Sequence, residues 1–271
     1  MLNNLFHFGS RTYIMGILNI TPDSFSDGGE YVYTDAAISH ALNMLAEGAD
    51  IIDIGGESSR PGHTQISIDE ELSRVIPIIR NLRNKTDAII SLDTRNGEVA
   101  EEGIKNGVNI LNDIWGLQGD PEMAKVAAKY NVPIIIMHNQ NGTDYKMDII
   151  LEMIDFFKKS IKIAIDAGIN SDNIILDPGI GFGKTVEQNI EVLSRLQEFK
   201  KLKYPILLGT SKKSTIGKIL DLPPNERVEG TIATTVLGIN QGIDIVRVHD
   251  VKENLRAAKV ADAIVRSNYN G

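Results

Sequence analysis

Short apolar runs rich in β-branched residues recur along the chain, and stretches with helical periodicity follow most of them. Eight runs predict strands: Tyr13–Leu18, Ile51–Ile54, Ala88–Leu92, Val108–Leu111, Val132–Met137, Ile174–Leu176, Ile206–Leu208 and Ile243–Val248. The runs are nearly continuous in their apolar character, which is typical of parallel strands buried on both faces.

Local signals predict where several helices begin and end. An apolar stripe over residues 38–45 is followed by Gly48, and another over residues 149–161 is followed by Gly168. Capping boxes are expected at Thr185 with Gln188, and, in a looser form, at Asp250 with Glu253.

Eight strand–helix units without a linker predict a single (β/α)8 TIM barrel over residues 1–271, in the α/β class. The alternative is a doubly wound open sheet, which would carry a glycine-rich phosphate turn after its first strand. Here that strand runs into Asn-Ile-Thr-Pro-Asp instead. The seventh connection, residues 211–225, is long and contains Pro223-Pro224, so we expect a functional or mobile loop there.

Composition narrows the range of functions. The 271 residues carry a net charge of −8 and no Lys/Arg-rich run, which argues against binding to nucleic acid or to an anionic membrane. The chain has no cysteine, which excludes disulfides and thiolate chemistry. Neither a signal sequence nor an apolar run of bilayer length is recognisable, so we expect a cytoplasmic protein.

Polar residues gather where the predicted strands end, which in a TIM barrel is the rim that carries the chemistry. They are Asn19, Asp93, Asn112-Asp113, His138, Asp177, Ser211 to Ser214, and Arg247 with His249, together with the loops at residues 21–29 and 55–62. The opposite ends of the strands have no comparable set. This asymmetry predicts an enzyme.

The residue types indicate which ligand the rim would hold. Asp93, Asn112 and Asp177 suit a flat heterocycle rich in N–H donors, and they would stabilise positive charge on it. Arg247 and His249, two residues apart on a strand, would share a face and meet an anion such as phosphate. Mg²⁺ usually accompanies polyphosphate, and Asn19 offers a hard oxygen ligand.

Each of these residues also has a purely structural interpretation. Asp93 could cap a helix and Asp177 could open a turn. Only one of Asn112 and Asp113 can point into the barrel, because neighbours on a strand face opposite sides. Lys212 and Lys213 could be solvated, and His138 could serve structure as readily as catalysis.

Four stretches resemble the dihydropteroate synthase family. They are residues 15–29 (MGILNITPDSFSDGG), 53–62 (DIGGESSRPG), 176–182 (LDPGIGF) and 247–251 (RVHDV). The resemblance extends over the whole chain, in the family's order. It implies condensation of 6-hydroxymethyl-7,8-dihydropterin diphosphate with 4-aminobenzoate through a pterin cation, sensitivity to sulfonamides and a homodimer.

The resemblance also implies residue roles. The pterin would contact Asp93, Asn112, Met137, Asp177, Lys213 and Arg247. The diphosphate would contact Asn19, Ser59, Arg247 and His249, with Asn19 as a ligand of Mg²⁺. The 4-aminobenzoate would lie among Phe25, Ser59, Pro61, Phe182, Lys213 and Ser214. Catalysis would rest on Asp27, Ser59, Arg60 and Lys213.

The chain departs from the family pattern at three places. Ser59 stands where threonine is usual, Lys212 where arginine is usual, and Asn139-Gln140-Asn141 where a second methionine and a glycine are commoner. Lysine cannot make the bidentate contact that arginine makes. The alternatives are a pterin-dependent methyltransferase, which would not need Asn19 or the Arg247/His249 pair, and a non-catalytic pterin-binding homologue.

Overall fold

Eight parallel strands form the centre of the molecule in the computed structural model, which describes residues 2–20, 30–57 and 65–266. The strands are β1 (Tyr13–Asn19), β2 (Ile51–Gly55), β3 (Ile89–Asp93), β4 (Ile110–Asp113), β5 (Ile134–Met137), β6 (Ile174–Asp177), β7 (Leu207–Leu208) and β8 (Ile245–Val248). Their order is β6-β5-β4-β3-β2-β1-β8-β7. A parallel bridge between Leu176 and Ile206 joins β6 to β7 and closes the barrel, so the open-sheet alternative is wrong.

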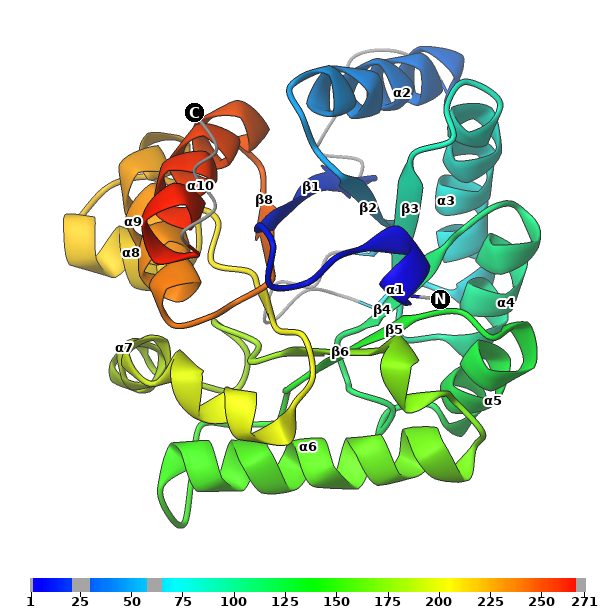
Figure 1. Ribbon diagram of the computed structural model, residues 1–271. Coiled ribbons are helices and arrows are strands. Elements are labelled where there is room, and N and C mark those ends of the chain that lie inside the picture. The colour runs from blue at the N-terminus through cyan, green and yellow to red at the C-terminus, as the bar shows by residue number, and fades with distance from the viewer. Residues whose placement is uncertain (1, 21–29, 58–64, 267–271) are drawn as a thin grey trace.

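Helices surround the strands as an outer layer (Figure 1). They are α2 (Glu30–Ala46), α3 (Ile68–Arg83), α4 (Gly97–Lys105), α5 (Pro121–Tyr130), α6 (Ile149–Asp166), α7 (Val186–Ser194), α8 (Ser214–Leu220), α9 (Val228–Asn240) and α10 (Val251–Val265). Short 3-10 turns lie at Ser171–Asn173, Leu196–Leu202 and Pro224–Glu226. The predicted (β/α)8 barrel is therefore confirmed, and none of these helices is long and apolar enough to cross a bilayer.

Side chains alternate along each strand between the helix-covered outside and the inside of the barrel. On β2, Ile52 and Ile54 pack in the outer core under the helices, whereas Ile51 packs inside the barrel. Asp53 lies on the same inward side as Ile51, two residues further along, and it is fully buried. The interior is thus apolar near the amino ends of the strands and polar toward their carboxyl ends.

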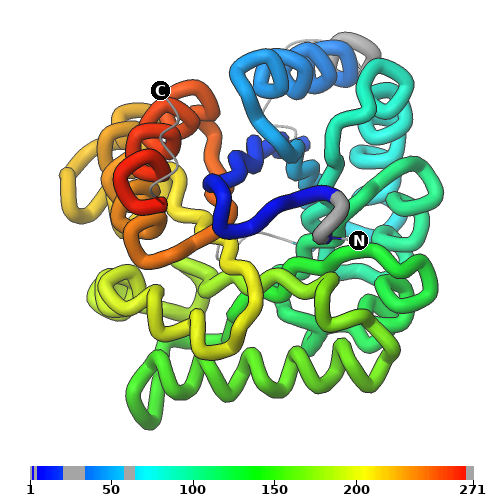
Figure 2. Tube along the Cα trace, in the orientation of Figure 1, coloured from blue at the N-terminus to red at the C-terminus, as the bar shows by residue number. Residues whose placement is uncertain are grey.

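The amino end of the barrel is closed by the N-terminal segment. Leu2 and Phe6, in and just after α1 (Leu2–Leu5), pack on the inward residues Met15, Ile51 and Ile245. Phe6 also meets the ring of Tyr13 edge to face, with 4.8 Å between centroids. Figure 2 shows this segment crossing the opening of the barrel. An apolar stopper therefore blocks the rim opposite the one that carries the polar residues.

The helix-end signals are confirmed except at one place. Gly48 and Gly168 follow their helices with φ of +104° and +95°. Thr185 and Gln188 form the predicted capping box. The looser box at Asp250 is wrong, because that side chain makes no cap and pairs with Lys212 instead.

The seventh connection differs from the expected loop. The helix α8 forms within it, and the 3-10 turn Pro224–Glu226 follows before α9 begins. Lys213 and Ser214 therefore stand where β7 leads into a helix. Arg227, which precedes α9, donates to the carbonyl oxygens of Lys212 at 2.9 Å and Leu222 at 2.8 Å. These bonds give the connection a defined conformation.

Replacing Phe6 by alanine tests the closure of the barrel. Phe6 is only 2% exposed, so Phe6→Ala removes a buried ring and should lower the free energy of unfolding by ~3–5 kcal/mol. Urea denaturation followed by circular dichroism measures this change. His7→Ala, an exposed neighbour, is the control and should change stability by less than about 0.5 kcal/mol. Equal stability of both variants would show that the segment does not close the barrel.

Candidate active site

Arg247 occupies the centre of the polar rim. Its Nε donates to Asp53 Oδ2 at 2.6 Å, and its Nη2 donates to Asp93 Oδ2 at 2.8 Å. The guanidinium comes from β8 and the two carboxylates from β2 and β3, so three strands hold one planar cation. Asp93 therefore does not cap a helix, and its carboxylate is directed into the barrel toward Arg247.

Asn112 and Asp113 face opposite sides of β4, as the alternation predicted. The amide nitrogen of Asn112 points inward and lies 3.3 Å from Asp53 Oδ2, whereas its Oδ1 is buried without a partner among the described residues. Asp113 turns away and accepts the backbone N–H groups of Trp115 and Leu117. Burial nevertheless raises the pKa of Asp113 to about 6.

Asp177 lies at the end of β6, where the chain turns sharply. Its Oδ1 accepts the N–H of Gly179 at 2.7 Å, so it does open a turn. Gly179 has φ +62°, and a Cβ there would lie 2.0 Å from the carbonyl oxygen of His138. Only glycine fits this position. Met137 is buried beside this turn, in register with Asp177 on the neighbouring strand.

Lys213 reaches across to the loop that follows Asp177. Its Nζ donates to the carbonyl oxygen of Ile180 and lies 4.6 Å from the centroid of the Phe182 ring. Ser214 is exposed beside it as the first residue of α8. Phe182, Lys213 and Ser214 are thus brought to one part of the rim by two different loops.

The charges of the rim influence one another. Burial raises the pKa of Asp93 to about 7, although Arg247 opposes the rise. Burial lowers the pKa of Lys213 to about 8 against the attraction of Asp177. Burial also raises the pKa of Asp177, opposed by Lys213 and Arg247. Asp93, Asp177, Lys213 and Arg247 therefore share one buried electrostatic environment, which is the arrangement expected for a small-molecule site.

His138 is a structural residue that is bound to a buried lysine. Its Nδ1 lies 2.9 Å from Lys184 Nζ, and this ammonium also meets the carbonyl oxygens of Gly179 and Phe182 at 3.0 Å each. Burial lowers the pKa of Lys184 to about 7, and burial with Lys184 lowers that of His138 to about 2. Lys184 therefore ties the loop that carries Phe182 to the end of β5.

His249 and Lys212 are held by polar partners beside the site. Ser211 Oγ accepts the backbone N–H of His249 at 3.1 Å and lies 2.9 Å from its Nδ1. Lys212 donates to Asp250 Oδ1 at 2.9 Å, while the buried Oδ2 of Asp250 has no hydrogen-bond partner among the described residues. A single lysine contact thus stands where a guanidinium could engage both oxygens.

Asn19 is exposed at the end of β1, in register with Gly55 of β2. Among the described residues, no group of three or more His, Asp or Glu side chains could hold a metal ion. A single amide oxygen at the rim fits Mg²⁺ that is bound chiefly through phosphate oxygens and water. Phe25, Asp27, Ser59, Arg60 and Pro61 lie outside the described residues.

Sequence reasoning missed three residues that organise the site: Asp53, Lys184 and Arg227. The first two could have been found from the alternation on β2 and from the charged residue in the glycine-rich stretch 179–184. Arg227 had no signal, because its role depends on how the seventh connection folds. The stretch 139–141 lies beside the site loop, where Gln140 packs against Gly183.

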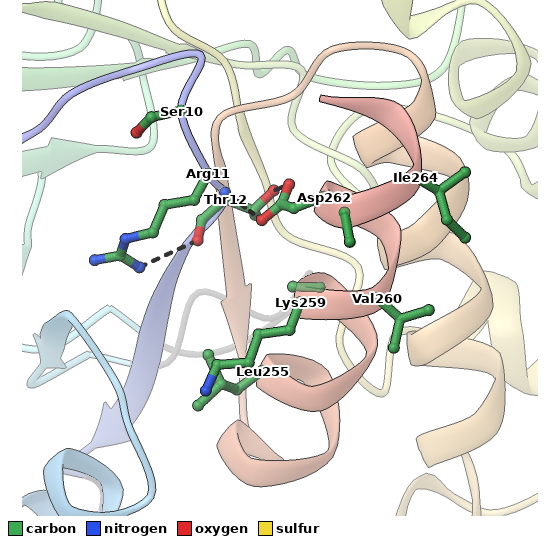
Figure 3. Close-up of a pocket in the computed structure, with 10 residues that line it drawn as sticks. Ser10, Arg11, Thr12, Leu255, Lys259, Val260, Asp262 and Ile264 are labelled. Atoms are coloured by element: carbon green, nitrogen blue, oxygen red, sulfur yellow. Dashed lines mark hydrogen bonds between the residues drawn. The ribbon is translucent and has the colours of Figure 1, made fainter. Parts of the chain in front are cut away.

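A separate cavity of about 620 Å³ lies between the start of β1 and α10 (Figure 3). Thr12 there donates its backbone N–H and its hydroxyl to the carboxylate of Asp262, at 2.7 and 2.8 Å. This cavity lies at the amino end of β1, whereas the residues around Arg247 gather at the carboxyl ends of the strands. It is therefore not part of the candidate active site.

The pH dependence of stability tests the buried position of Lys184. The folded pKa of about 7 lies below the ordinary 10.5, so between these values the unfolded chain binds more protons. The contribution of Lys184 to stability should therefore rise with pH from about 7 to about 10.5. The unfolding free energy of the wild type minus that of Lys184→Met should therefore increase with pH over that range.

Urea titrations at several pH values measure this difference. Lys159→Met, which alters an exposed lysine of α6, is the matched control and should run parallel to the wild type. A constant difference for Lys184→Met would contradict the buried, charge-disfavouring environment.

Comparisons with known proteins agree with this geometry. The family model described as pterin binding enzyme matches residues 15–249. A dihydropteroate synthase from Clostridium beijerinckii is 57% identical over 262 residues, covering 96% of this chain and 97% of the relative.

Two solved structures extend the comparison. A dihydropteroate synthase from Clostridium difficile, solved in the presence of pteroic acid, has a TM-score of 0.95 and 60% identity, covering 96% of this chain and 99% of that one. The Xanthomonas albilineans enzyme with 4-aminobenzoic acid has a TM-score of 0.90 and 38% identity, covering 94% of each chain. The chain belongs to the dihydropteroate synthases, a family of pterin-binding transferases.

Proposed function

We propose that the chain joins 6-hydroxymethyl-7,8-dihydropterin diphosphate to 4-aminobenzoate and releases diphosphate, as the final condensation of dihydropteroate synthesis. The observation that carries the proposal is the buried, partnerless Oδ1 of Asn112, next to the Asp93–Arg247 pair. A buried acceptor without a partner costs about 1–3 kcal/mol, which a ring N–H would recover. A relative that is 57% identical over nearly the whole chain is a dihydropteroate synthase.

The pterin is proposed to lie at the carboxyl end of the barrel between Asp93, Asn112 and Asp177. These groups accept hydrogen bonds, and a pterin edge carries several N–H donors. Met137 would line the pocket, and the planar guanidinium of Arg247 would lie against the ring. The buried carboxylates would exchange part of their present contacts for bonds to the ring.

The reaction itself requires little covalent chemistry from the protein. The bond between the pterin methylene carbon and the diphosphate oxygen breaks, and both electrons leave with the diphosphate. The resulting pterin cation is attacked by the nitrogen lone pair of 4-aminobenzoate, which then loses a proton. Asp93 and Asp177 supply negative charge beside the cation in a low-dielectric site, where such stabilisation is strong.

The diphosphate is proposed to face Arg247 and His249, with Ser59 from the second loop. Asn19 would hold Mg²⁺, which neutralises the charge of the leaving diphosphate when it is bound. Ser211 Oγ lies 2.9 Å from Nδ1 of His249 and so orients the imidazole ring at the end of β8. By resemblance to the family, Asp27 and Arg60 would take part in catalysis from the first two loops.

The 4-aminobenzoate is proposed to lie further out, against Phe182, Lys213 and Ser214, with Phe25 and Pro61 from the first two loops. Lys213 contacts the Phe182 ring and is attracted electrostatically by Asp177. It can therefore meet both substrates.

The cellular location that we propose for the protein is the cytoplasm. Neither the methyltransferase nor the non-catalytic alternative is supported by a specific observation.

We further propose a homodimer formed through α8, α9 and α10. These helices pack against each other in sequence, and Figure 1 shows them side by side on one side of the barrel. Together they expose large apolar side chains: Ile219, Leu220, Val236, Leu237, Val260, Ile264 and Val265. Such an apolar surface favours a second copy of the chain, because water contact with it is costly.

Product formation tests the activity. Purified protein with both substrates and Mg²⁺ should form 7,8-dihydropteroate with one diphosphate released per product, measured by chromatography and a phosphate assay coupled to a pyrophosphatase. Removal of Mg²⁺ with EDTA should suppress turnover. Lys213→Ala should lower kcat/KM by more than about 100-fold while the variant still folds, as circular dichroism can verify, because Lys213 lies at the rim and outside the apolar core. A wild-type protein that forms no product would reject the proposal.

Light scattering during gel filtration tests the dimer. The wild type should elute with about twice the chain mass of 29.8 kDa. Leu237→Lys puts a charge where a side chain is 61% exposed on α9, and it should give the monomer mass. Leu151→Lys on α6 is a comparably exposed control that should leave the mass unchanged. A monomeric wild type would refute the homodimer.

A further inference from the structure

Asp53 is fully buried inside the barrel, below the residues assigned to the pterin. It lies on the inward face of β2, in register with Ile17 on β1 and Ser91 on β3. The next inward residue above it is Gly55, which pairs with Asp93. Asp53 therefore sits one layer deeper than Asp93, beneath the position where a ligand would lie.

Two pterin residues converge on this one carboxylate. Arg247 donates to Oδ2 through Nε at 2.6 Å, and Asn112 approaches the same oxygen with its amide nitrogen at 3.3 Å. Asp53 thus joins β8 to β4 across the interior of the barrel. A fully buried carboxylate is tolerated only with such partners, so its charge and theirs depend on each other.

The contact with Asn112 decides which end of the amide faces the ligand. An ionised carboxylate accepts hydrogen bonds and has none to give, so the amide NH₂ must turn toward Asp53. The amide oxygen is then directed away from Asp53, and it is the atom that is buried without a partner. Asn112 is thereby set as an acceptor, which selects a ligand that offers an N–H at this position.

The contact with Arg247 fixes the guanidinium plane. Nε is held by Asp53 and Nη2 by Asp93 at 2.8 Å, so two carboxylates on adjacent strands determine its orientation. The two carboxylates share one cation. With Asp53 neutralised, Asp93 alone would hold the guanidinium, and the face that Arg247 offers to a ring would no longer be set from two directions.

We propose that Asp53 is a positioning and specificity-determining residue, which fixes Asn112 as a hydrogen-bond acceptor and orients Arg247 without touching the substrate. The inference rests on the pterin placement proposed above. It assigns the donor preference of the pocket to a residue one layer below it. Because Asp53 lies beneath the ligand, it should affect pterin binding and leave the outer 4-aminobenzoate position unchanged.

Asp53→Asn is the variant that separates this role from a structural one. An asparagine keeps the size of the side chain but can donate as well as accept, so Asn112 becomes free to present either end of its amide. Ser91→Ala is the matched control, since Ser91 occupies the same layer on the neighbouring strand and its Oγ has no hydrogen-bond partner among the described residues. Thermal unfolding verifies that both variants fold.

Calorimetry measures binding of 6-hydroxymethyl-7,8-dihydropterin and two analogues, the oxidised pterin without the N–H at position 8 and the compound without the 2-amino group. The wild type and Ser91→Ala should reject at least one analogue. Asp53→Asn should bind the dihydropterin ~10- to 100-fold more weakly and lose most of that discrimination. Its KM for 4-aminobenzoate should stay within about twofold of the wild-type value.

The outcomes distinguish this inference from the proposed function. A wild type that binds none of the three compounds would overturn both. A wild type that binds and discriminates, with Asp53→Asn showing the same preference, would overturn the role of Asp53 alone. If Asp53→Asn does not fold at 25 °C, Asp53→Ser takes its place in the same series, because its hydroxyl also donates and accepts.

Discussion

The site depends on one buried arginine shared by two carboxylates. Arg247 is only 15% exposed, and it meets Asp53 and Asp93 from two neighbouring strands. Burial alone would lower the pKa of this guanidinium, but the two carboxylates hold it above its usual value. Because a buried charge without partners is costly, the three residues must be present together. Their contacts bring β2, β3 and β8 into a common arrangement at the polar end of the barrel.

The surroundings of this group suit the proposed route through a pterin cation, in which the protein supplies no nucleophile. Burial raises the pKa of Asp93 and of Asp177, so a low-dielectric environment disfavours their ionised forms unless positive charge lies nearby. A ring that develops positive charge would compensate both carboxylates at once. The burial that disfavours the two ionised carboxylates therefore favours a cation beside them. The protein dipoles need not reorganise when the positive charge appears on the ring.

The fold was predictable because the signals for it are local and repeated. Each β-rich run predicted a strand, and the glycines at 48 and 168 ended their helices as expected. The polar rim followed from the position of residues such as Asp93 at the strand ends. Chain direction alone places the carboxyl ends of parallel strands together, so the sequence could reveal which residues would meet.

The contacts within the site were less predictable, because they depend on distances between strands. Asp53 lies inside an apolar run, and only the alternation along β2 shows that it faces inward. From the sequence alone, Lys184 would be taken for a loop lysine. The turn at Gly179 nevertheless buries it against His138. The predicted helix cap at Asp250 does not form, because Lys212 binds that carboxylate. The helix α8 was not predicted, because the prolines that follow it indicate a loop.

The apolar stopper at the amino end also bears on how ligands reach the site. Leu2 and Phe6 pack together with the inward residues of the strands and fill this end of the barrel, so the polar rim faces solvent from the carboxyl side. With the pterin in the deeper position proposed above and 4-aminobenzoate in the outer one, the pterin would bind first and the bound 4-aminobenzoate would hinder its exchange. A site that is open on one side only would thus impose an order on binding and release, set by how deep each ligand lies.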